Sequence, residues 1–206
     1  MDINKRNNIL CTAEKLFYTI GMNATTMDKL AKESGITKKT IYNYFDSKED
    51  IYYEVMLKSY YELNRFLKTN LEKNNNVTGI DKIKIIGSSL IEFNKTNPNA
   101  FKAIFDFQNK DLDNILKNDT AVKCYEEGQY IVETIIKIIK EGIEKGILDD
   151  KIDINKTFAM LWAFIVGMTN LINYKSEYIE RYLGLCIEDI LNYSYDTIFL
   201  TLKKKN

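Results

Sequence analysis

The chain has 206 residues, of which 45% are hydrophobic, so it can bury a substantial core in one large or two small domains. Its 29 Lys and Arg residues balance 29 Asp and Glu residues, so the overall charge does not favour a nucleic acid partner. Histidine is absent, which excludes Ser-His and Cys-His catalysis and His-based zinc sites.

The remaining composition narrows the class of protein further. Cys11, Cys124 and Cys186 are scattered and odd in number, so we expect reduced thiols in a cytoplasmic protein. No glycine-rich phosphate loop or metal-ligand spacing is present, and we expect no metal and no cofactor. No apolar run approaches the length of a membrane span and no signal peptide is recognised, which indicates no membrane association. Carboxylates alone can do chemistry, but we do not expect an enzyme.

The first third of the chain predicts three short helices. The first spans about residues 4–20 with a single apolar stripe. The second begins near Thr25 or Thr26, where Thr25 and Asp28 form a capping-box-like pair. Gly35 lies where this helix must stop, at a position that favours a left-handed backbone. The inner face of the second helix has the i, i+3, i+4 spacing and consists of Met27, Leu30 and Ala31.

The third predicted helix runs from Lys38 to about Phe45 and is capped by Thr37. Ile41 points inward, and the outward residues are Lys38, Lys39, Thr40, Tyr42 and Asn43. This face has two lysines and no acid, so the pattern predicts a helix-turn-helix whose second helix enters a DNA major groove.

A long helix follows, capped by Ser47 with Asp50 as its partner. Lys48 lies in its first turn, where the helix dipole disfavours a cation unless an anion binds there. A solvated lysine is the simpler interpretation of Lys48 alone; beside a helix-turn-helix, a DNA phosphate is the favoured partner.

Residues from about Asn4 to Val55 resemble the TetR family of transcriptional regulators. The matching runs are Ala13–Phe17, Gly21, Ala24–Met27, Leu30–Phe45 and Ser47–Ile51. The resemblance implies an all-α, dimeric protein of the repressor type. It places a three-helix DNA-binding domain in residues 1–50, with the helix-turn-helix at about 26–45. Residues 51–206 would form a helical ligand-binding and dimerisation domain.

The resemblance, position by position, adds Thr25, Thr26, Tyr44 and Lys48 to the outward residues of the third helix. Lys39 stands where many family members have Gly. The candidate DNA contacts are Thr25, Thr26, Lys38, Lys39, Thr40, Tyr42, Asn43, Tyr44 and Lys48.

The rest of the chain predicts further helices separated by polar loops. Tyr52, Met56, Tyr60, Leu63 and Leu67 form one stripe on the long helix, which is expected to extend to Lys73 and join the DNA-binding part to the body. The later expected helices span about 80–95, 98–107, 120–145 and 153–174, with a last one inside 177–203, a short polar helix or loop at 108–118 and a frayed tail at 203–205.

Aromatic residues and acids in the body suggest a ligand pocket. Such a pocket suits a lipophilic cation, an acyl chain or another apolar ligand. For any single one of these residues ordinary core packing is the favoured interpretation, and the resemblance supports the existence of a pocket. The candidate pocket residues are Phe93, Phe105, Tyr125, Glu126, Tyr130, Phe158 and Trp162. The last two helices are the candidate dimer interface, through Ile165, Val166, Thr169, Ile172, Leu183, Cys186, Ile190 and Tyr193; completion of the monomer core is the alternative.

The sequence therefore predicts a homodimeric regulator that binds a palindromic double-stranded DNA operator and is released by a small lipophilic effector. Two alternatives stay open. One is a DNA-binding protein without an inducer, and the other is a helical enzyme or small-molecule-binding module with a vestigial head.

Overall fold

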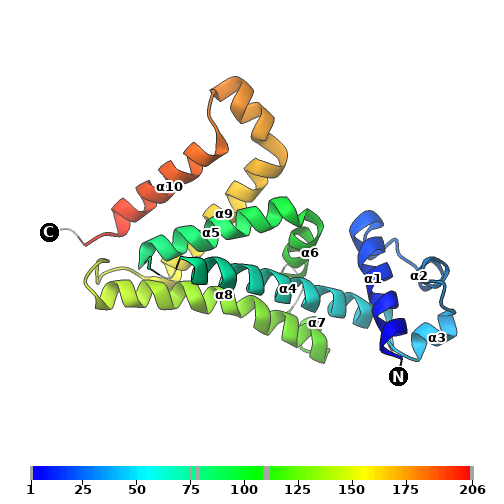
Figure 1. Cartoon of the computed structure of the whole chain (residues 1–206). Coiled ribbons are helices and arrows are strands. Elements are labelled where there is room, and N and C mark those ends of the chain that lie inside the picture. Colours follow the sequence, from blue (N-terminus) through cyan, green and yellow to red (C-terminus); the bar gives the residue numbers. More distant parts are fainter. Residues whose placement is uncertain (1, 75, 78, 109–111, 205–206) are drawn as a thin grey trace. The chain divides into compact units, whose positions relative to one another are not determined.

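The computed structural model describes residues 2–74, 76–77, 79–108 and 112–204, and every element named in them is helical. This confirms the predicted all-α fold. The helices are α1 (Ile3–Ile20), α2 (Met27–Ser34), α3 (Lys38–Tyr42), α4 (Lys48–Lys73), α5 (Ile80–Thr96), α6 (Pro98–Gln108), α7 (Leu112–Ile115), α8 (Asp119–Glu144), α9 (Ile154–Tyr178), the π-helical turn η1 (Ile179–Leu183) and α10 (Ile187–Leu202) (Figure 1).

The chain forms two compact units, and the long helices α4 and α8 each contribute to both. The first unit contains residues 1–64 and 97–129, and the second contains residues 65–96 and 130–206. The head, by which we mean α1 to α3, therefore shares its unit with the first turns of α4 and with α6, α7 and the start of α8. The predicted domain boundary after residue 50 stays a prediction.

The cap of α2 differs from the expected one. Thr26, and not Thr25, is the N-cap, and its side chain accepts a hydrogen bond from the Lys29 amide at 3.1 Å. Thr25 is fully buried, and its hydroxyl donates to the Gly21 carbonyl at 2.9 Å. The pairing of Thr25 with Asp28 was therefore wrong, because Thr25 belongs to the turn that closes α1.

The expected caps of the next two helices are confirmed. Thr37 accepts from the Thr40 amide at 3.2 Å, and Ser47 accepts from the Asp50 amide at 3.0 Å. Helix α3 ends at Tyr42, earlier than the predicted Phe45, because the backbone tightens there: the Asn43 and Tyr44 amides donate to the carbonyls three residues back.

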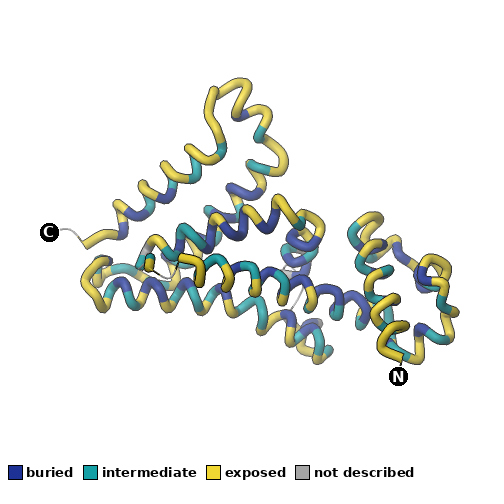
Figure 2. The backbone as a smooth tube through the Cα atoms, in the orientation of Figure 1, coloured by how far each residue is buried: buried dark blue, intermediate teal, exposed yellow. Residues whose placement is uncertain are grey.

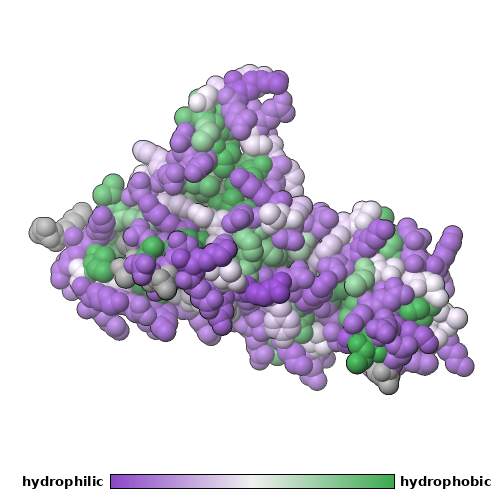
Figure 3. All heavy atoms as spheres, viewed as in Figure 1, coloured by the Kyte–Doolittle hydropathy of each residue, from purple (hydrophilic) through white to green (hydrophobic). Residues whose placement is uncertain are grey.

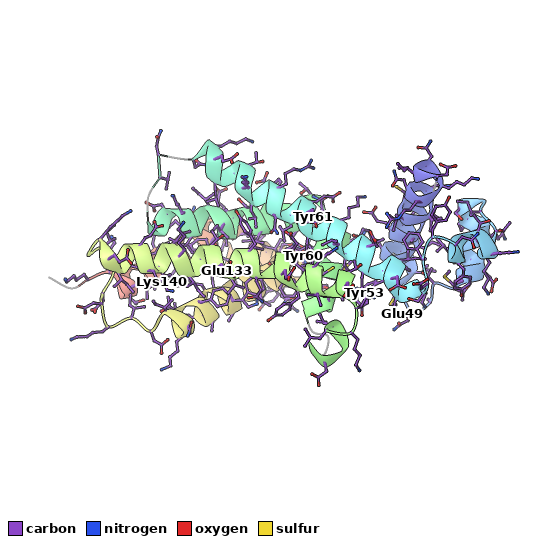
Figure 4. The ribbon with its side chains drawn as sticks, turned by 90° about the horizontal axis from the view of Figure 1, so that it is seen from below. Glu49, Tyr53, Tyr60, Tyr61, Glu133 and Lys140 are labelled. Carbon is purple, nitrogen blue, oxygen red and sulfur yellow. The ribbon has the colours of Figure 1, made fainter. Side chains whose placement is uncertain are left out.

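The apolar stripe predicted for α4 is confirmed. Tyr52, Met56, Tyr60, Leu63 and Leu67 are all buried, and dark segments recur along the helix in Figure 2. Phe107 of α6 packs edge-on against two tyrosines of α4. Its ring centroid lies 6.1 Å from that of Tyr53 and 5.9 Å from that of Tyr60. Figure 4 labels both tyrosines along α4. Large side chains recur on α4 with the 3.6-residue period of a helix, and their burial holds this face of α4 in the core.

In the second unit, α5 and α10 approach closely at a glycine. A Cβ atom added to Gly87 would lie 1.6 Å from the Tyr195 hydroxyl oxygen. The Tyr195 ring is buried, stacks on Phe199 at 5.9 Å and meets Phe164 edge-on at 5.1 Å. Among the described residues its hydroxyl has no hydrogen-bond partner. Glycine at position 87 therefore leaves the space that this tyrosine occupies.

Helix α9 is longer than expected and continues into η1. Its N-cap Asp153 is confirmed by a 3.1 Å bond from the Lys156 amide, but the helical run extends to Leu183 rather than to Tyr174. By length and composition alone, the segment Ile154–Leu183 could cross a membrane, with a mean hydropathy of 1.3 over 18 residues, of which only 28% are buried. This corrects the expectation that no run approaches that length. Hydrophobic side chains gather over α9 and α10 in Figure 3.

The end of α10 is held by the turn that joins α8 to α9. Leu148 and Lys203 form an isolated antiparallel bridge, the Asp149 amide donates to the Leu202 carbonyl at 3.1 Å, and the Lys204 amide donates to the Ile147 carbonyl at 3.2 Å. Residues 203 and 204 are therefore not a frayed tail, as the sequence suggested, and residue 205 lies outside the described residues.

Candidate DNA-binding site

The site is built on a small core inside the head. Ile9 and Ala13 of α1, Leu30 of α2 and Ile41 of α3 are all fully buried. Burial of these apolar side chains fixes α2 and α3 on α1, and so decides which residues of α3 face outward.

The turn between α2 and α3 depends on Gly35, which has the left-handed backbone expected for it (φ +67°). Its amide and that of Ile36 donate to carbonyls at the end of α2. The Asn8 side chain of α1 adds a 3.0 Å bond to the Ser34 carbonyl. These bonds satisfy the last carbonyls of α2 and set the angle at which α3 leaves it.

The outer face of α3 is exposed, as the periodicity predicted. Lys38, Lys39, Tyr42 and Asn43 are exposed, and 46% of Tyr42 is accessible. The Thr40 hydroxyl is half-buried and shares a 2.8 Å hydrogen bond with the Thr37 hydroxyl. Two ammonium groups and a phenol on one short surface helix suit contacts to phosphates and base edges.

Lys38 is already paired with an acid of α2. Its Nζ lies 2.9 Å from Asp28 Oδ2, and this hydrogen bond raises the pKa of the lysine. A DNA phosphate that binds Lys38 must compete with Asp28. The acid therefore lowers the positive potential of the surface that would meet DNA.

The D28N variant is expected to bind operator DNA a few-fold more tightly, because Lys38 is then free to neutralise a phosphate. The plot of log affinity against log salt concentration should steepen by about one per copy. A salt titration of operator affinity measures both effects. An unchanged slope would show that Lys38 does not neutralise a phosphate.

Lys48 has a different environment from the one expected for it. Its Nζ donates to the Met22 and Thr25 carbonyls, at 3.0 Å each, in the turn before α2. Lys48 is therefore not a simple solvated lysine. It joins the first turn of α4 to the start of the helix-turn-helix, and its contact with a phosphate stays a prediction.

Three side-chain links hold α1 against α4. Arg6 pairs with Glu54 at 2.6 Å and lies over the Phe45 ring at 5.1 Å. Lys58 pairs with Glu14 at 2.6 Å. The Tyr18 and Ser59 hydroxyls are 2.7 Å apart, and burial raises the pKa of Tyr18 to about 12. The head and the first turns of α4 therefore share both polar and apolar contacts.

The candidate pocket residues divide between the two units. Phe105, Tyr125 and Glu126 belong to the first, and Tyr125 and Glu126 are exposed. Phe93, Tyr130, Phe158 and Trp162 belong to the second, where Phe93 is buried and Phe158 stacks on Trp162 at 6.3 Å. Their assignment to a pocket stays a prediction.

The first unit contains a half-open cleft of about 670 Å³, and none of the seven candidate pocket residues lines it. The cleft lies between the end of α1, α4 and α6. Its lining includes Phe17, Tyr52 and Lys102.

The candidate interface residues differ in how much surface they offer. Leu183, Cys186 and Tyr193 are exposed, with 75% of Tyr193 accessible. Val166, Ile172 and Ile190 are half-buried. Ile165 and Thr169 are buried within the chain itself, and the Thr169 hydroxyl donates to the Ile165 carbonyl at 2.9 Å, so these two add little to a surface for a partner.

Sequence reasoning missed Asn118. Its Oδ1 accepts from the Thr120 and Ala121 amides at 3.0 Å each, and its Nδ2 donates to Asp50 Oδ1 at 2.7 Å. The preference of Asn for helix N-caps was a usable signal for the first role. No local pattern indicates the second, because Asp50 and Asn118 are far apart in sequence.

A buried three-helix core, a glycine turn and an exposed basic helix define a helix-turn-helix DNA-binding protein. Comparison with known proteins agrees, since residues 9–55 match the model of the bacterial regulatory proteins of the tetR family. The chain therefore has a DNA-binding head of the TetR type and is a transcriptional regulator.

Individual relatives support this assignment. The HTH-type transcriptional regulator YhgD of Bacillus subtilis is 28% identical over 147 residues, 71% of each chain. The negative regulator IcaR of the icaADBC biofilm operon in Staphylococcus aureus is 28% identical over 157 residues, 69% of this chain and 78% of IcaR. The structure of FadR from Bacillus subtilis in complex with stearoyl-CoA has a TM-score of 0.68 at 18% identity, over 94% of this chain and 97% of FadR; this likeness shows the shared fold.

Proposed function

We propose that this protein is a cytoplasmic, homodimeric repressor that binds a palindromic operator and leaves it when a small lipophilic molecule binds. It acts by binding and not by catalysis. The observation that carries the proposal is the exposed outer face of α3, where Lys38, Lys39 and Tyr42 project from a helix held by a buried core.

In this proposal the residues of α3 and those just after it divide into two groups. Lys38, Tyr42 and Tyr44, together with Lys48, contact phosphates and position the head. Thr40 and Lys39 reach base edges, where a lysine can recognise guanine. Each copy of the dimer places one α3 in a major groove, with half-sites one DNA turn or a multiple apart.

Repression and release by a ligand have support from relatives. IcaR is named as a negative regulator, and the FadR structure holds stearoyl-CoA. A lipophilic effector suits the aromatic side chains of the body, such as Phe158 and Trp162. The effector must bind more tightly to the dimer whose heads no longer match the operator, because only unequal affinity shifts the equilibrium.

The second copy is proposed to cover the apolar surface of α9, η1 and α10. Tyr174, Tyr182 and Leu183 are more than half exposed in the isolated chain. A monomeric soluble protein rarely leaves a large contiguous apolar surface open to water. Gly167 of α9 adds to the support, because a Cβ there would meet no atom of its own chain within 4 Å and the position is open to a close helix crossing.

Alkylation of the three cysteines tests this interface. Burial raises the pKa of Cys124 to about 12, so its thiol is neutral and unreactive near pH 8. Cys11 and Cys186 are exposed in the isolated chain. We expect iodoacetamide to label Cys11 at any protein concentration and to label Cys186 only at dilutions where the dimer dissociates. Peptide mass mapping after timed labelling measures this, and equal rates for both thiols in the dimer would contradict the interface.

The function itself is tested by fluorescence anisotropy on the DNA immediately upstream of the gene, at physiological salt with excess competitor DNA. Saturable binding well above the competitor background is the expected result. Acyl-CoA thioesters and lipophilic cations are then screened for release of the DNA. Specific binding that no such compound affects would favour a DNA-binding protein without an inducer, and absence of sequence preference after a genome-wide selection would favour a vestigial head.

A further inference from the structure

The first turn of α4 is hydrogen-bonded on one side to the start of α8 and on the other to the turn before α2. Asn118 accepts from the first amides of α8 through Oδ1 and donates to Asp50 through Nδ2. Asp50 lies in the first turn of α4, between Glu49 and Ile51, and Figure 4 labels Glu49 and Tyr53 at this end of the helix. All these residues belong to the first compact unit.

The same turn of α4 also contacts the turn before α2. Asp50 Oδ2 accepts from the Ser47 hydroxyl at 2.7 Å, which completes the cap of α4. Lys48, in the same turn of helix, donates to the Met22 and Thr25 carbonyls just before the N-cap of α2. A displacement of the α8 start can therefore reach the helix-turn-helix through the Asn118–Asp50 bond, the backbone of the first turn of α4 and the Lys48 bonds.

Helix α8 is also held to α4 further along. The Cys124 thiol donates to the Tyr53 carbonyl at 3.4 Å, and both residues are buried. Asn118 differs from this contact because it joins two helix caps with one side chain. Each cap restricts the other, since a planar amide can serve both only in one orientation.

We propose that Asn118 is a positioning residue that couples the start of α8 to the DNA-binding head through Asp50. It sets the orientation of the first turn of α4 and, through Lys48, that of α2 and α3. The regulatory part of this inference rests on the proposed function, because α8 extends into the second unit, where the effector is proposed to bind.

The chemistry of the pair allows a sharp test. In N118D the carboxylate still caps α8, because Asp is as good an N-cap as Asn. It cannot donate to Asp50, and two carboxylates then face each other at hydrogen-bond distance. In the swapped double variant D50N/N118D, Asn at 50 donates to Asp at 118 and accepts from Ser47, so the link is restored in reverse.

We expect N118D to lower operator affinity about tenfold and the D50N/N118D variant to recover most of that loss. Fluorescence anisotropy on operator DNA without any effector measures both affinities. The single variant D50N completes the double-mutant cycle. The matched control is I115V, which trims a buried side chain near Asn118 and leaves the link intact. It should lower stability while leaving the affinity of the folded protein unchanged.

The outcomes are distinguishable. Equal affinities of N118D and the swapped variant would overturn the coupling, as would an N118D affinity equal to that of the wild type. A wild-type protein that binds no operator at all would contradict the proposed function instead. The swap keeps the same two side-chain types at this half-buried pair, so it restores the hydrogen bond without changing the composition of the site.

Discussion

Replacement of Tyr42 by alanine is expected to lower operator affinity roughly 100-fold, because each copy of the dimer loses a hydrogen bond to a charged phosphate worth about 1.5 kcal/mol. Nearly half of Tyr42 is accessible, and the core of the head lies on the opposite face of α3 at Ile41. The thermal stability of Y42A should therefore stay close to that of the wild type. Anisotropy and circular dichroism measure the two quantities.

Two companion variants make this result specific. Y42F keeps the ring and removes the hydroxyl, so it separates the hydrogen bond from packing on the sugar-phosphate backbone. Y61A removes a similarly exposed tyrosine of α4 and should leave DNA binding unchanged. An unchanged operator affinity in Y42A would remove Tyr42 from the interface and weaken the assignment of the whole α3 surface.

The second large effect is expected at Gly87. In G87A the new methyl group would overlap the Tyr195 hydroxyl, which cannot swing away because its ring is packed by Phe164 and Phe199. Overpacking of this kind costs about 1–3 kcal/mol, more than the gain in helix propensity from Gly to Ala of about 1 kcal/mol. Urea denaturation should show a net loss of stability.

Partial recovery is expected when the hydroxyl is removed. Y195F alone should be neutral or slightly stabilising, because the buried hydroxyl has no partner among the described residues. The double variant G87A/Y195F should lie between G87A and the wild type. G128A in α8 is the control for helix propensity, since its methyl group would make only ordinary contacts with the Tyr60 ring, at 3.4 Å or more. A stability of G87A equal to that of G128A would contradict the close approach of α5 and α10.

The elements that sequence alone predicted well are those with a periodic or capping signal. The buried stripe of α4 from Tyr52 to Leu67 follows directly from the 3.6-residue period. Gly35 has the predicted left-handed backbone and Asp153 is the predicted N-cap of α9, because both features depend on neighbouring residues only. The outward face of α3 was predictable for the same reason.

Features that depend on contacts distant in sequence were not predictable. The two carbonyls of the α1–α2 turn that accept from Lys48 could not be inferred from the sequence around position 48, because only the fold brings them there. The bridge between Leu148 and Lys203 involves a segment whose composition resembled a frayed tail. The π-helical turn after Tyr178 has no clear local signal, because propensity does not separate it from a continued α-helix.

The links between α1 and α4 have a consequence for building hybrid regulators. Arg6, Glu14 and Tyr18 find their partners at Glu54, Lys58 and Ser59, well beyond residue 50. A DNA-binding head transplanted onto a foreign sensor should therefore keep α4 at least as far as Asn64, the end of the first of the two stretches that make up the first compact unit. A junction at residue 50 would replace all three partner residues at once, and α1 would lose its hydrogen bonds and ion pairs to α4.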